Sequence, residues 1–211
     1  MKYIIMCGGD YHTEHPKQLR EYGTGLTILE RTIKFLQTFG ASDIAISTND
    51  SRFEWLGLPI LHHENNFGNG GHWLEAFYPT DEPACYIFGD VFFSPDAIKT
   101  IVNTETDGVE FFASAPPFSE EYTKMWAEPF AFKVQNQKLF RDSIDKTIRL
   151  AEAGKFNREP IAWELWQVIK GTPLNHIDYH NYVAINDYTT DFDNDEEFKE
   201  FKRKVLMVAD R

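Results

Sequence analysis

The chain has 211 residues, 42% of them hydrophobic and 26% charged, a composition typical of a soluble globular protein with a full core. Its formal net charge of -12 argues against a nucleic-acid-binding surface, because such surfaces need clustered Lys and Arg. An acidic chain can still bind a nucleotide where a divalent cation screens the phosphates, so carboxylate pairs are the feature to look for.

Short apolar runs alternate with amphipathic stretches in the first half of the chain. Residues 2–6 predict a strand, and residues 26–39 predict a helix that ends at Gly40. We expect further strands over 43–48, 58–63 and 84–88, with a short helix over 70–78. This alternation predicts an α/β fold: a Rossmann-like, mostly parallel or mixed sheet with helices on both faces.

The second half of the chain is less regular. We expect strands over 109–114 and 129–134, helices over 138–153 and 160–170, and an extended segment over 176–186. A last helix is predicted over about 193–208, with Asp191 or Asp193 as its N-cap. No repeat or flexible linker divides the sequence, so residues 1–211 are expected to form a single domain.

Two cysteines, Cys7 and Cys85, lie far apart in or beside apolar runs, which favours buried free thiols in a reducing compartment. Residues 1–6 run directly into a glycine turn, unlike a signal peptide, and no apolar segment is long enough to span a membrane. We therefore expect a cytoplasmic protein with no membrane or nucleic-acid partner.

Ligands of open α/β sheets bind beyond the carboxyl ends of the strands, which directs attention first to the stretch after residues 2–6. Gly8 and Gly9 allow close backbone approach to a phosphate, and Lys17 could supply a positive charge. The stretch is neither a Walker A loop nor a G-x-G-x-x-G loop. The alternative interpretation is a strand that simply turns into a helix.

Two aspartates follow other predicted strands. Asp90 leaves the strand over 84–88 after a glycine, and its carboxylate suits Mg²⁺, although a turn aspartate is the alternative. Asp187 follows the apolar residues 182–186 and is a candidate for the second metal ligand, since Asp191 is expected to cap the last helix. Two strand-end aspartates together indicate a metal site more strongly than either one does.

A loop rich in asparagine and glycine, residues 64–71, precedes the short helix predicted over 70–78. Its Asn69, Gly70 and Gly71 suit hydrogen bonding to a base or ribose, while a plain glycine-rich turn is the alternative. The seven histidines show no metal-ligand spacing, and the absence of a G-x-S-x-G motif argues against a serine hydrolase.

Residues 118–130 and 158–169 are rich in Trp and Glu. A pocket lined by residues of this kind, such as Trp126, Glu128 and Glu164, would suit a cationic group. Trp163 and Trp166 belong to the same stretch, but their helical spacing favours simple core packing.

Several motifs occur in an order that resembles the nucleotidyltransferases that make nucleoside-diphosphate sugars and CDP-alcohols. They are IIMCGG (4–9), HPKQL (15–19), TILERTIKFLQTFGASDIAISTN (27–49), YIFGDVFFS (86–94) and NDYTTDF (186–192). The resemblance covers most of residues 1–105 and returns at about 182–195. It implies a nucleotide-diphospho-sugar-transferase-like fold.

The resemblance divides the chain into a nucleotide-binding half (1–105), an acceptor-binding part (106–180), and the metal-aspartate strand with the C-terminal helix (181–211). It implies that the nucleotide binds near the glycines Gly8, Gly9, Gly70 and Gly71 with Asn69. It also implies that Lys17 neutralises the α-phosphate and that Asp90 and Asp187 bind Mg²⁺. In the acceptor-binding part, Trp126, Glu128 and Glu164 are the candidates for binding the acceptor, and a sugar 1-phosphate is the leading class of acceptor.

The loop after Gly9 departs from the family, in which Gly-x-Gly-x-Arg is usual and the arginine holds the β- and γ-phosphates. Here residues 10–13 are Asp, Tyr, His and Thr, and no arginine precedes Pro16. Either Arg20 or His12 replaces it, or the donor differs, or catalysis is weakened.

We therefore predict an EC 2.7.7-type, Mg²⁺-dependent nucleotidyltransferase that joins a nucleoside triphosphate to a sugar 1-phosphate or phosphorylated small alcohol and releases pyrophosphate, in surface-polysaccharide precursor synthesis. Self-association into a homo-oligomer is left open. The alternatives are a glycosyltransferase that uses a nucleotide-sugar donor and a nucleotide-binding regulatory protein without catalysis.

Overall fold

A computed structural model describes residues 1–8, 14–21, 25–63, 72–115, 127–177, 179–192 and 195–203, and all structural statements below refer to these residues. They form one seven-stranded mixed sheet with the strand order β3-β2-β1-β4-β6-β5-β7. Four neighbouring strands are parallel: β1 (Lys2–Met6), β2 (Ile44–Ser47), β3 (Ile60–Leu61) and β4 (Ala84–Phe88). β6 (Glu128–Val134) is antiparallel to β4 and to β5 (Val109–Ser114), and β7 (Val183–Ala184) is parallel to β5.

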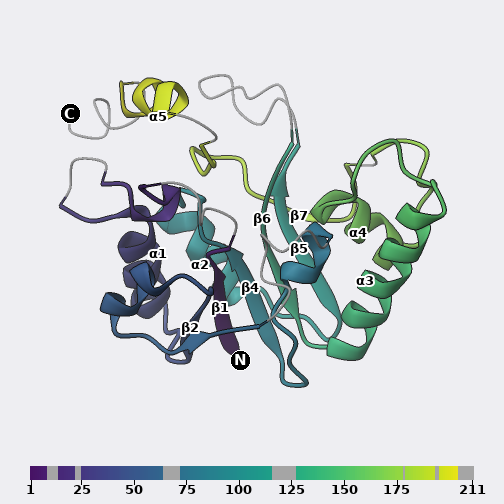
Figure 1. The fold of residues 1–211 in the computed structure, drawn as a ribbon, viewed down its shortest axis with the longest axis horizontal. Coiled ribbons are helices and arrows are strands. Elements are labelled where there is room, and N and C mark those ends of the chain that lie inside the picture. The colour runs from purple at the N-terminus through teal and green to yellow at the C-terminus, as the bar shows by residue number, and fades with distance from the viewer. Residues whose placement is uncertain are drawn as a thin grey trace.

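Helices cover both faces of this sheet (Figure 1). α1 (Ile28–Thr38) and α2 (Pro95–Asn103) lie on one face, while α3 (Gln137–Glu152) and α4 (Ala162–Lys170) lie on the other. β1 rises from the N-terminus in Figure 1, so the carboxyl ends of the parallel strands form the upper edge, near α5 (Asp195–Phe201). Three short 3₁₀ helices connect strands: η1 (Lys17–Leu19), η2 (Ser51–Leu56) and η3 (Trp73–Ala76).

Local sequence explains where the helices begin. Thr27 and Glu30 form a capping box, in which each side chain accepts a hydrogen bond from the backbone N–H of the other residue, at 3.1 and 2.8 Å. Ser94 caps α2 by accepting the N–H of Ala97, and Pro95 occupies the first helical position. These signals are local, which is why the sequence predicts α1 and α2 to within a few residues.

The predicted α/β fold class is confirmed, and the mixed alternative is the one that forms. The strand expected over 58–63 is reduced to β3, and the extended segment over 176–186 contributes only β7. The prediction that Asp191 caps the last helix is wrong, because α5 begins four residues later, at Asp195; Asp193 lies outside the described residues. Residues 204–211 of the predicted helix also lie outside them.

The core packs aromatic side chains between the sheet and the α3–α4 layer. Trp163 and Trp166 are buried, with ring centroids 4.9 and 5.6 Å from that of Phe111 on β5. The packing interpretation of these tryptophans is therefore confirmed. Cys7 and Cys85 are also buried and free, as expected, and burial raises the pKa of both thiols. None of the described helices combines the length and apolar character that crossing a bilayer requires.

Lys133 is an unusual member of the core because its charged side chain is 6% exposed. Its Nζ donates hydrogen bonds of 3.0 and 2.8 Å to the carbonyl oxygens of Ile101 and Val102, near the C-terminal end of α2. Burial lowers the pKa of this lysine. The ammonium thus satisfies carbonyl groups that the helix itself leaves without a partner.

We expect Lys133→Met to destabilise the protein, because methionine fills the space but leaves two buried carbonyl groups without a donor. Hydrogen bonds to a charged group contribute about 1.5–3 kcal/mol each, part of which is offset by relief of the buried charge. The expected loss of about 1–3 kcal/mol corresponds to a fall in Tm of roughly 2–4 °C per kcal/mol, measured by thermal unfolding. Lys99→Met, a change of an exposed lysine on α2, is the matched control and should leave Tm nearly unchanged.

Candidate active site

β1 and β4 approach each other closely where both strands end. The N–H of Gly89 donates to the carbonyl oxygen of Met6 at 2.9 Å. A Cβ at position 89 would lie 2.6 Å from both that oxygen and the Sγ of Cys7, so a larger residue would push the strands apart. Glycine therefore allows the following Asp90 to lie beside the segment that leaves β1.

Lys17 and Asp90 meet at this edge of the sheet. The Nζ of Lys17, in η1, lies 3.3 Å from Oδ2 of Asp90, and the two side chains are 21% and 31% exposed. The structure thus brings together the predicted phosphate-binding lysine and a predicted metal-binding aspartate, 73 positions apart in the numbering (90 − 17). The contact is partly accessible, as a ligand-binding pair must be.

The C-terminal segment is joined to the loop after β4 by an antiparallel bridge between Phe92 and Thr190. The N–H of Phe92 donates to the Thr190 carbonyl at 2.7 Å, and the N–H of Thr190 donates back at 3.2 Å. This bridge places the two predicted metal-binding stretches, residues 89–94 and 186–192, side by side. They lie almost 100 positions apart in the sequence.

Both carboxylate oxygens of Asp187 accept hydrogen bonds within this junction. Oδ2 accepts from the hydroxyl of Ser94 at 2.5 Å, and Oδ1 accepts from the N–H of Thr189 at 2.7 Å. Thr189 in turn accepts the N–H of Ser94 at 3.0 Å through its Oγ1. Asp187 therefore holds the C-terminal segment against the cap of α2.

Asp191 is the acidic neighbour that acts on Asp90. In an antiparallel pairing of Phe92 with Thr190, residues before Phe92 align with residues after Thr190. This alignment sets Asp191 opposite the residue just after Asp90, while Asp187 is aligned with the residue just after Ser94. The electrostatics agree, because the negative charge of Asp191 contributes to the pKa of Asp90.

The pKa of Asp90 is raised above its ordinary value of 3.8. Burial is the main cause; Lys17 opposes the shift and Asp191 adds to it. Two neighbouring carboxylates with incomplete charge compensation are a donor set that suits Mg²⁺, which binds proteins through one or two carboxylates and completes its shell with water and substrate phosphates. The described residues contain no cluster of three metal-ligating side chains. Asp90 and Asp191 thus fit a metal shared with a substrate.

Arg52, on η2 after β2, holds the segment that leads to Lys17. Its Nε donates to Oδ1 and Oδ2 of Asp50 at 3.0 and 2.8 Å, and its Nη2 donates to Oδ2 at 2.5 Å. Its Nη1 donates to the Glu14 carbonyl at 3.1 Å. Burial alone would raise the pKa of Asp50, but its contacts with Arg52 hold that pKa below its usual value. The ionised pair anchors the chain three residues before Lys17.

The remaining predicted residues are only partly described. Gly8 lies two residues beyond the end of β1, where a phosphate-binding backbone was predicted. The others that the structure does not describe are Gly9, His12, Asn69, Gly70, Gly71 and Trp126. Their roles stay predictions.

The two predicted acceptor-binding glutamates are both buried. Glu164 contacts residues just before α4: its Oε1 lies 2.7 Å from Nε of Arg158, and its Oε2 accepts the N–H of Ile161 at 3.0 Å. Glu128 begins β6 opposite Ser114, next to residues 116–126 that are not described. The contacts of Glu164 stabilise the start of a helix, and the acceptor-binding roles of Glu164 and Glu128 stay predictions.

Sequence reasoning missed Asp191 and Arg52 as members of the site. The sequence favours Asp191 as a helix cap because it precedes an acidic amphipathic stretch, with Asp193 as the alternative cap. Arg52 has no motif around it, since its role depends on a carbonyl 38 positions earlier (52 − 14). The motif NDYTTDF (186–192) contains Asp191, but only the bridge between residues 92 and 190 brings that residue near Asp90.

A mixed sheet in this strand order, with a lysine and two aspartates at the carboxyl ends of β1 and β4, is an arrangement suited to nucleotide binding. Known structures with the same fold include nucleotidyltransferases. One, described as a glucose-1-phosphate thymidylyltransferase from Bacillus anthracis in complex with sucrose, matches with a TM-score of 0.58 and 14% identity over 96% of this chain and 94% of that one.

A second match is the CTP:phosphocholine cytidylyltransferase from Streptococcus pneumoniae, with a TM-score of 0.57 and 14% identity over 96% of this chain and 97% of that one. No protein-family model and no curated protein sequence matches the chain. The fold implied by the motifs is therefore confirmed, and the shared fold extends over almost the whole chain.

We expect Asp90→Asn to raise Tm at pH 7. A carboxyl whose pKa is raised holds its proton more tightly in the folded chain than in the unfolded one, so ionised Asp90 costs stability at neutral pH. The cost fades as the pH falls toward the ordinary value of 3.8, where wild type and variant should converge. Thermal unfolding at pH 7 and pH 4 measures both effects.

Asp107→Asn, a change of an exposed aspartate that is not part of the candidate site, is the control for this comparison. Mg²⁺ should raise the Tm of wild type and of Asp107→Asn more than that of Asp90→Asn, because a ligand that binds only the folded state stabilises it. A lower Tm for Asp90→Asn at pH 7 would contradict the electrostatic account of the site.

Proposed function

We propose that the protein is a Mg²⁺-dependent nucleotidyltransferase that joins a nucleoside triphosphate to a sugar 1-phosphate or phosphorylated small alcohol. The observation that carries the proposal is the meeting of Lys17 with Asp90 at 3.3 Å, with Asp191 nearby, beyond the ends of β1 and β4. The fold shared with two nucleotidyltransferase structures supports it. We place the reaction in the cytoplasm, in the synthesis of surface-polysaccharide precursors.

In the proposed reaction an acceptor phosphate oxygen attacks the α-phosphorus of the triphosphate. A new P–O bond forms, the bond from the α-phosphorus to the oxygen bridging to the β-phosphate breaks, and pyrophosphate leaves with that electron pair. Positioning and electrostatic stabilisation supply most of the rate in such transfers. No covalent enzyme intermediate is required.

Lys17 is proposed to stabilise the charge that develops on the α-phosphate. Its Nζ is held by Asp90 from one side, and Arg52 anchors the preceding segment through the Glu14 carbonyl. The ammonium is therefore directed before substrate binds, which lowers the cost of reorganisation. Lysine acts here as a compact point charge rather than as a bidentate donor.

Asp90 and Asp191 are the residues proposed to hold Mg²⁺, which when bound would neutralise phosphate charge. Asp187 is proposed to support the site indirectly, through Ser94 and Thr189. This assignment differs from the pairing of Asp90 with Asp187 that the sequence predicts. The difference follows from the alignment of Phe92 with Thr190.

Incubation of the protein with each nucleoside triphosphate, Mg²⁺ and a panel of phosphorylated sugars and alcohols, with assay of pyrophosphate, tests the function. Release with one pair of substrates supports the proposal. Release of a nucleoside diphosphate from a nucleotide sugar would indicate a glycosyltransferase instead. Nucleotide binding without turnover of any pair would indicate a regulatory protein.

With the active pair of substrates, Lys17→Ala and Asp90→Ala should each lower kcat by at least about 100-fold, the effect typical of removing one contact to developing charge. Near-wild-type activity of Asp90→Ala would show that the metal assignment is wrong.

Asp191→Asn and Asp187→Asn separate the two metal assignments. We expect Asp191→Asn to lower kcat by about 100-fold with little change in Tm, since it removes a charge from the proposed metal site. We expect Asp187→Asn to lower the free energy of unfolding by about 1–3 kcal/mol, and Tm with it, because its charged hydrogen bonds to Ser94 and Thr189 are weakened. If instead Asp187→Asn lowered kcat and Asp191→Asn lowered Tm, Asp187 would be assigned as the metal ligand.

A further inference from the structure

Arg31 on α1 contacts both segments of the junction between the loop after β4 and the C-terminal part of the chain. Its Nε donates to the carbonyl oxygen of Phe93 at 3.3 Å, and its Nη2 lies 3.5 Å, as donor, from the hydroxyl oxygen of Tyr188. Phe93 belongs to the first segment and Tyr188 to the second. One guanidinium therefore ties the junction to a helix of the α1–α2 face.

The same guanidinium packs on two aromatic rings. Its Cζ lies 4.4 Å from the ring centroid of Phe35, one turn further along α1, and 4.5 Å from that of Phe92. Phe92 is 1% exposed and forms the antiparallel bridge with Thr190. Arginine suits this position because its planar group can lie over rings and donate hydrogen bonds at the same time, whereas lysine offers only a compact charge.

The contacts of Arg31 end beside the carboxylates to which the proposed function assigns the metal. Asp90 precedes Phe92 by two residues. Asp191 directly follows Thr190, the bridge partner of Phe92. A shift of the bridge relative to α1 would therefore change how the two carboxylates face each other. Mg²⁺ demands near-ideal octahedral geometry with ligands at about 2.0–2.1 Å, so a small displacement of either carboxylate would lower its affinity.

We propose that Arg31 is a positioning residue for the metal site. It holds the bridge between Phe92 and Thr190 against α1, and Asp90 and Asp191 are thereby kept where they can share a divalent cation. The inference rests on the proposed function, because that proposal assigns the two aspartates to the metal. The positive charge of Arg31 itself disfavours a nearby cation, so its geometric effect and its charge predict opposite results when the residue is replaced.

Binding of Mn²⁺ to the full-length protein, followed by the loss of the free-ion signal in electron paramagnetic resonance, tests the proposal without any substrate. We expect Arg31→Met to weaken Mn²⁺ binding about tenfold, the lower end of the effect of removing groups that orient metal ligands. Arg31→Lys keeps the charge but not the planar donor group, so it should weaken binding less. If only the charge mattered, Arg31→Met would bind Mn²⁺ more tightly than the wild type, and the proposal would be overturned.

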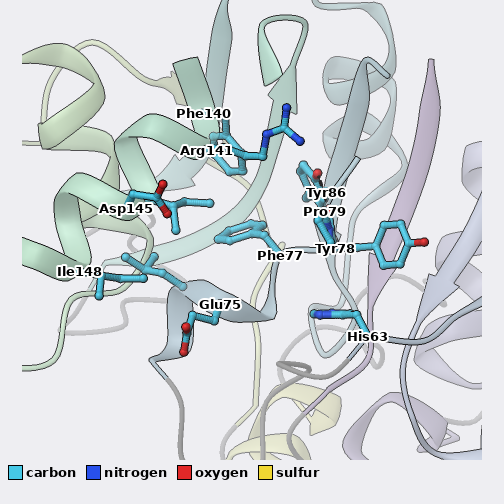
Figure 2. A pocket seen from close by; sticks show the side chains of 12 residues that line it. His63, Glu75, Phe77, Tyr78, Pro79, Tyr86, Phe140, Arg141, Asp145 and Ile148 are labelled. Carbon is cyan, nitrogen blue, oxygen red and sulfur yellow. Dashed lines mark hydrogen bonds between the residues drawn. The ribbon is translucent and has the colours of Figure 1, made fainter. Parts of the chain in front are cut away.

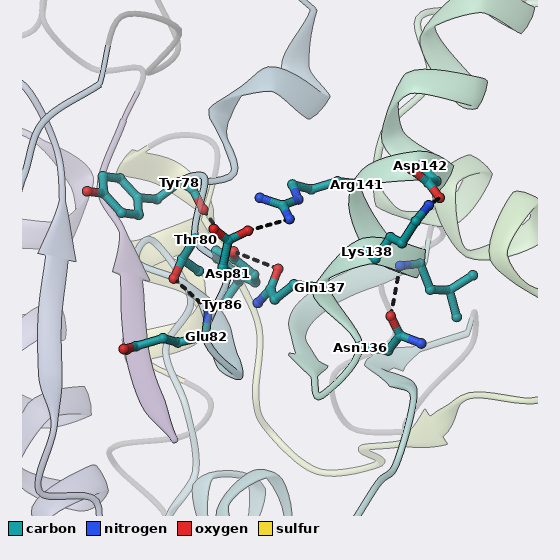
Figure 3. A network of polar contacts seen from close by, with 11 residues as sticks. Tyr78, Thr80, Asp81, Glu82, Tyr86, Asn136, Gln137, Lys138, Arg141 and Asp142 are labelled. Atoms are coloured by element: carbon teal, nitrogen blue, oxygen red, sulfur yellow. Dashed lines mark hydrogen bonds and ion pairs between the residues drawn. The ribbon is translucent and has the colours of Figure 1, made fainter.

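Arg141→Met is the matched control. Arg141 belongs to α3, on the other face of the sheet from α1, and borders a depression lined by residues of α3, η3 and β4 (Figure 2). Its Nη2 lies 2.6 Å from Oδ1 of Asp81, which ties α3 to the segment before β4 (Figure 3). This arginine also joins a helix to a neighbouring segment, but on the side of the sheet away from the bridge. Its replacement should leave the affinity for Mn²⁺ unchanged.

Hydrogen–deuterium exchange shows whether the junction itself has loosened. We expect the backbone amides of Phe92 and Thr190 to exchange about tenfold faster in Arg31→Met than in the wild type, with α3 and α4 unchanged. Faster exchange with an unchanged affinity for Mn²⁺ would mean that Arg31 only stabilises the fold, and would overturn the proposal. Weaker Mn²⁺ binding without faster exchange would overturn it as well, because the bridge would not be the link.

Circular dichroism checks the folding of each variant, and Arg31→Lys keeps the test decisive if Arg31→Met does not fold. Absence of Mn²⁺ binding by the wild-type protein would overturn the metal site, and the role of Arg31 with it. Wild-type binding that the Arg31 variants leave unchanged would overturn the role of Arg31 alone. The two failures are therefore distinguishable.

Discussion

The antiparallel bridge between Phe92 and Thr190 is the contact on which the candidate site depends. Two backbone hydrogen bonds join the loop after β4 to a segment almost 100 positions later, and Ser94, Asp187 and Thr189 reinforce the junction. Phe92 is buried with Phe192 and Phe201, so the junction has its own small apolar core. Without this bridge Asp90 would face Lys17 alone, and the second carboxylate would have no fixed place.

The site is built on a close approach of two strands. Gly89 allows β4 to end against β1, which sets Asp90 beside the chain that leads to η1, while Arg52 anchors that chain from β2. The result is a cation and two anions held near each other in partial burial, which costs stability and is typical of sites that bind charged ligands. The raised pKa of Asp90 expresses that cost.

The two faces of the sheet differ in the side chains that they bury. The α1–α2 face carries Lys133, whose buried ammonium satisfies carbonyl groups of α2. The α3 face carries a dense aromatic core, including Trp163 and Trp166. Many of the chain's aromatic side chains therefore go into packing.

Apolar periodicity, helix caps and a glycine before an acid are local signals, so the α/β class, most strands and helices, and the choice of Lys17 and Asp90 as candidate site residues follow from the sequence. Tertiary structure alone decided that β6 runs antiparallel between β4 and β5, and that Asp191 rather than Asp187 acts on Asp90. From the sequence, Asp187 is the candidate metal ligand and Asp191 an expected helix cap. Only the alignment of Phe92 with Thr190 sets Asp187 against Ser94 and brings Asp191 close enough to Asp90 to affect its pKa.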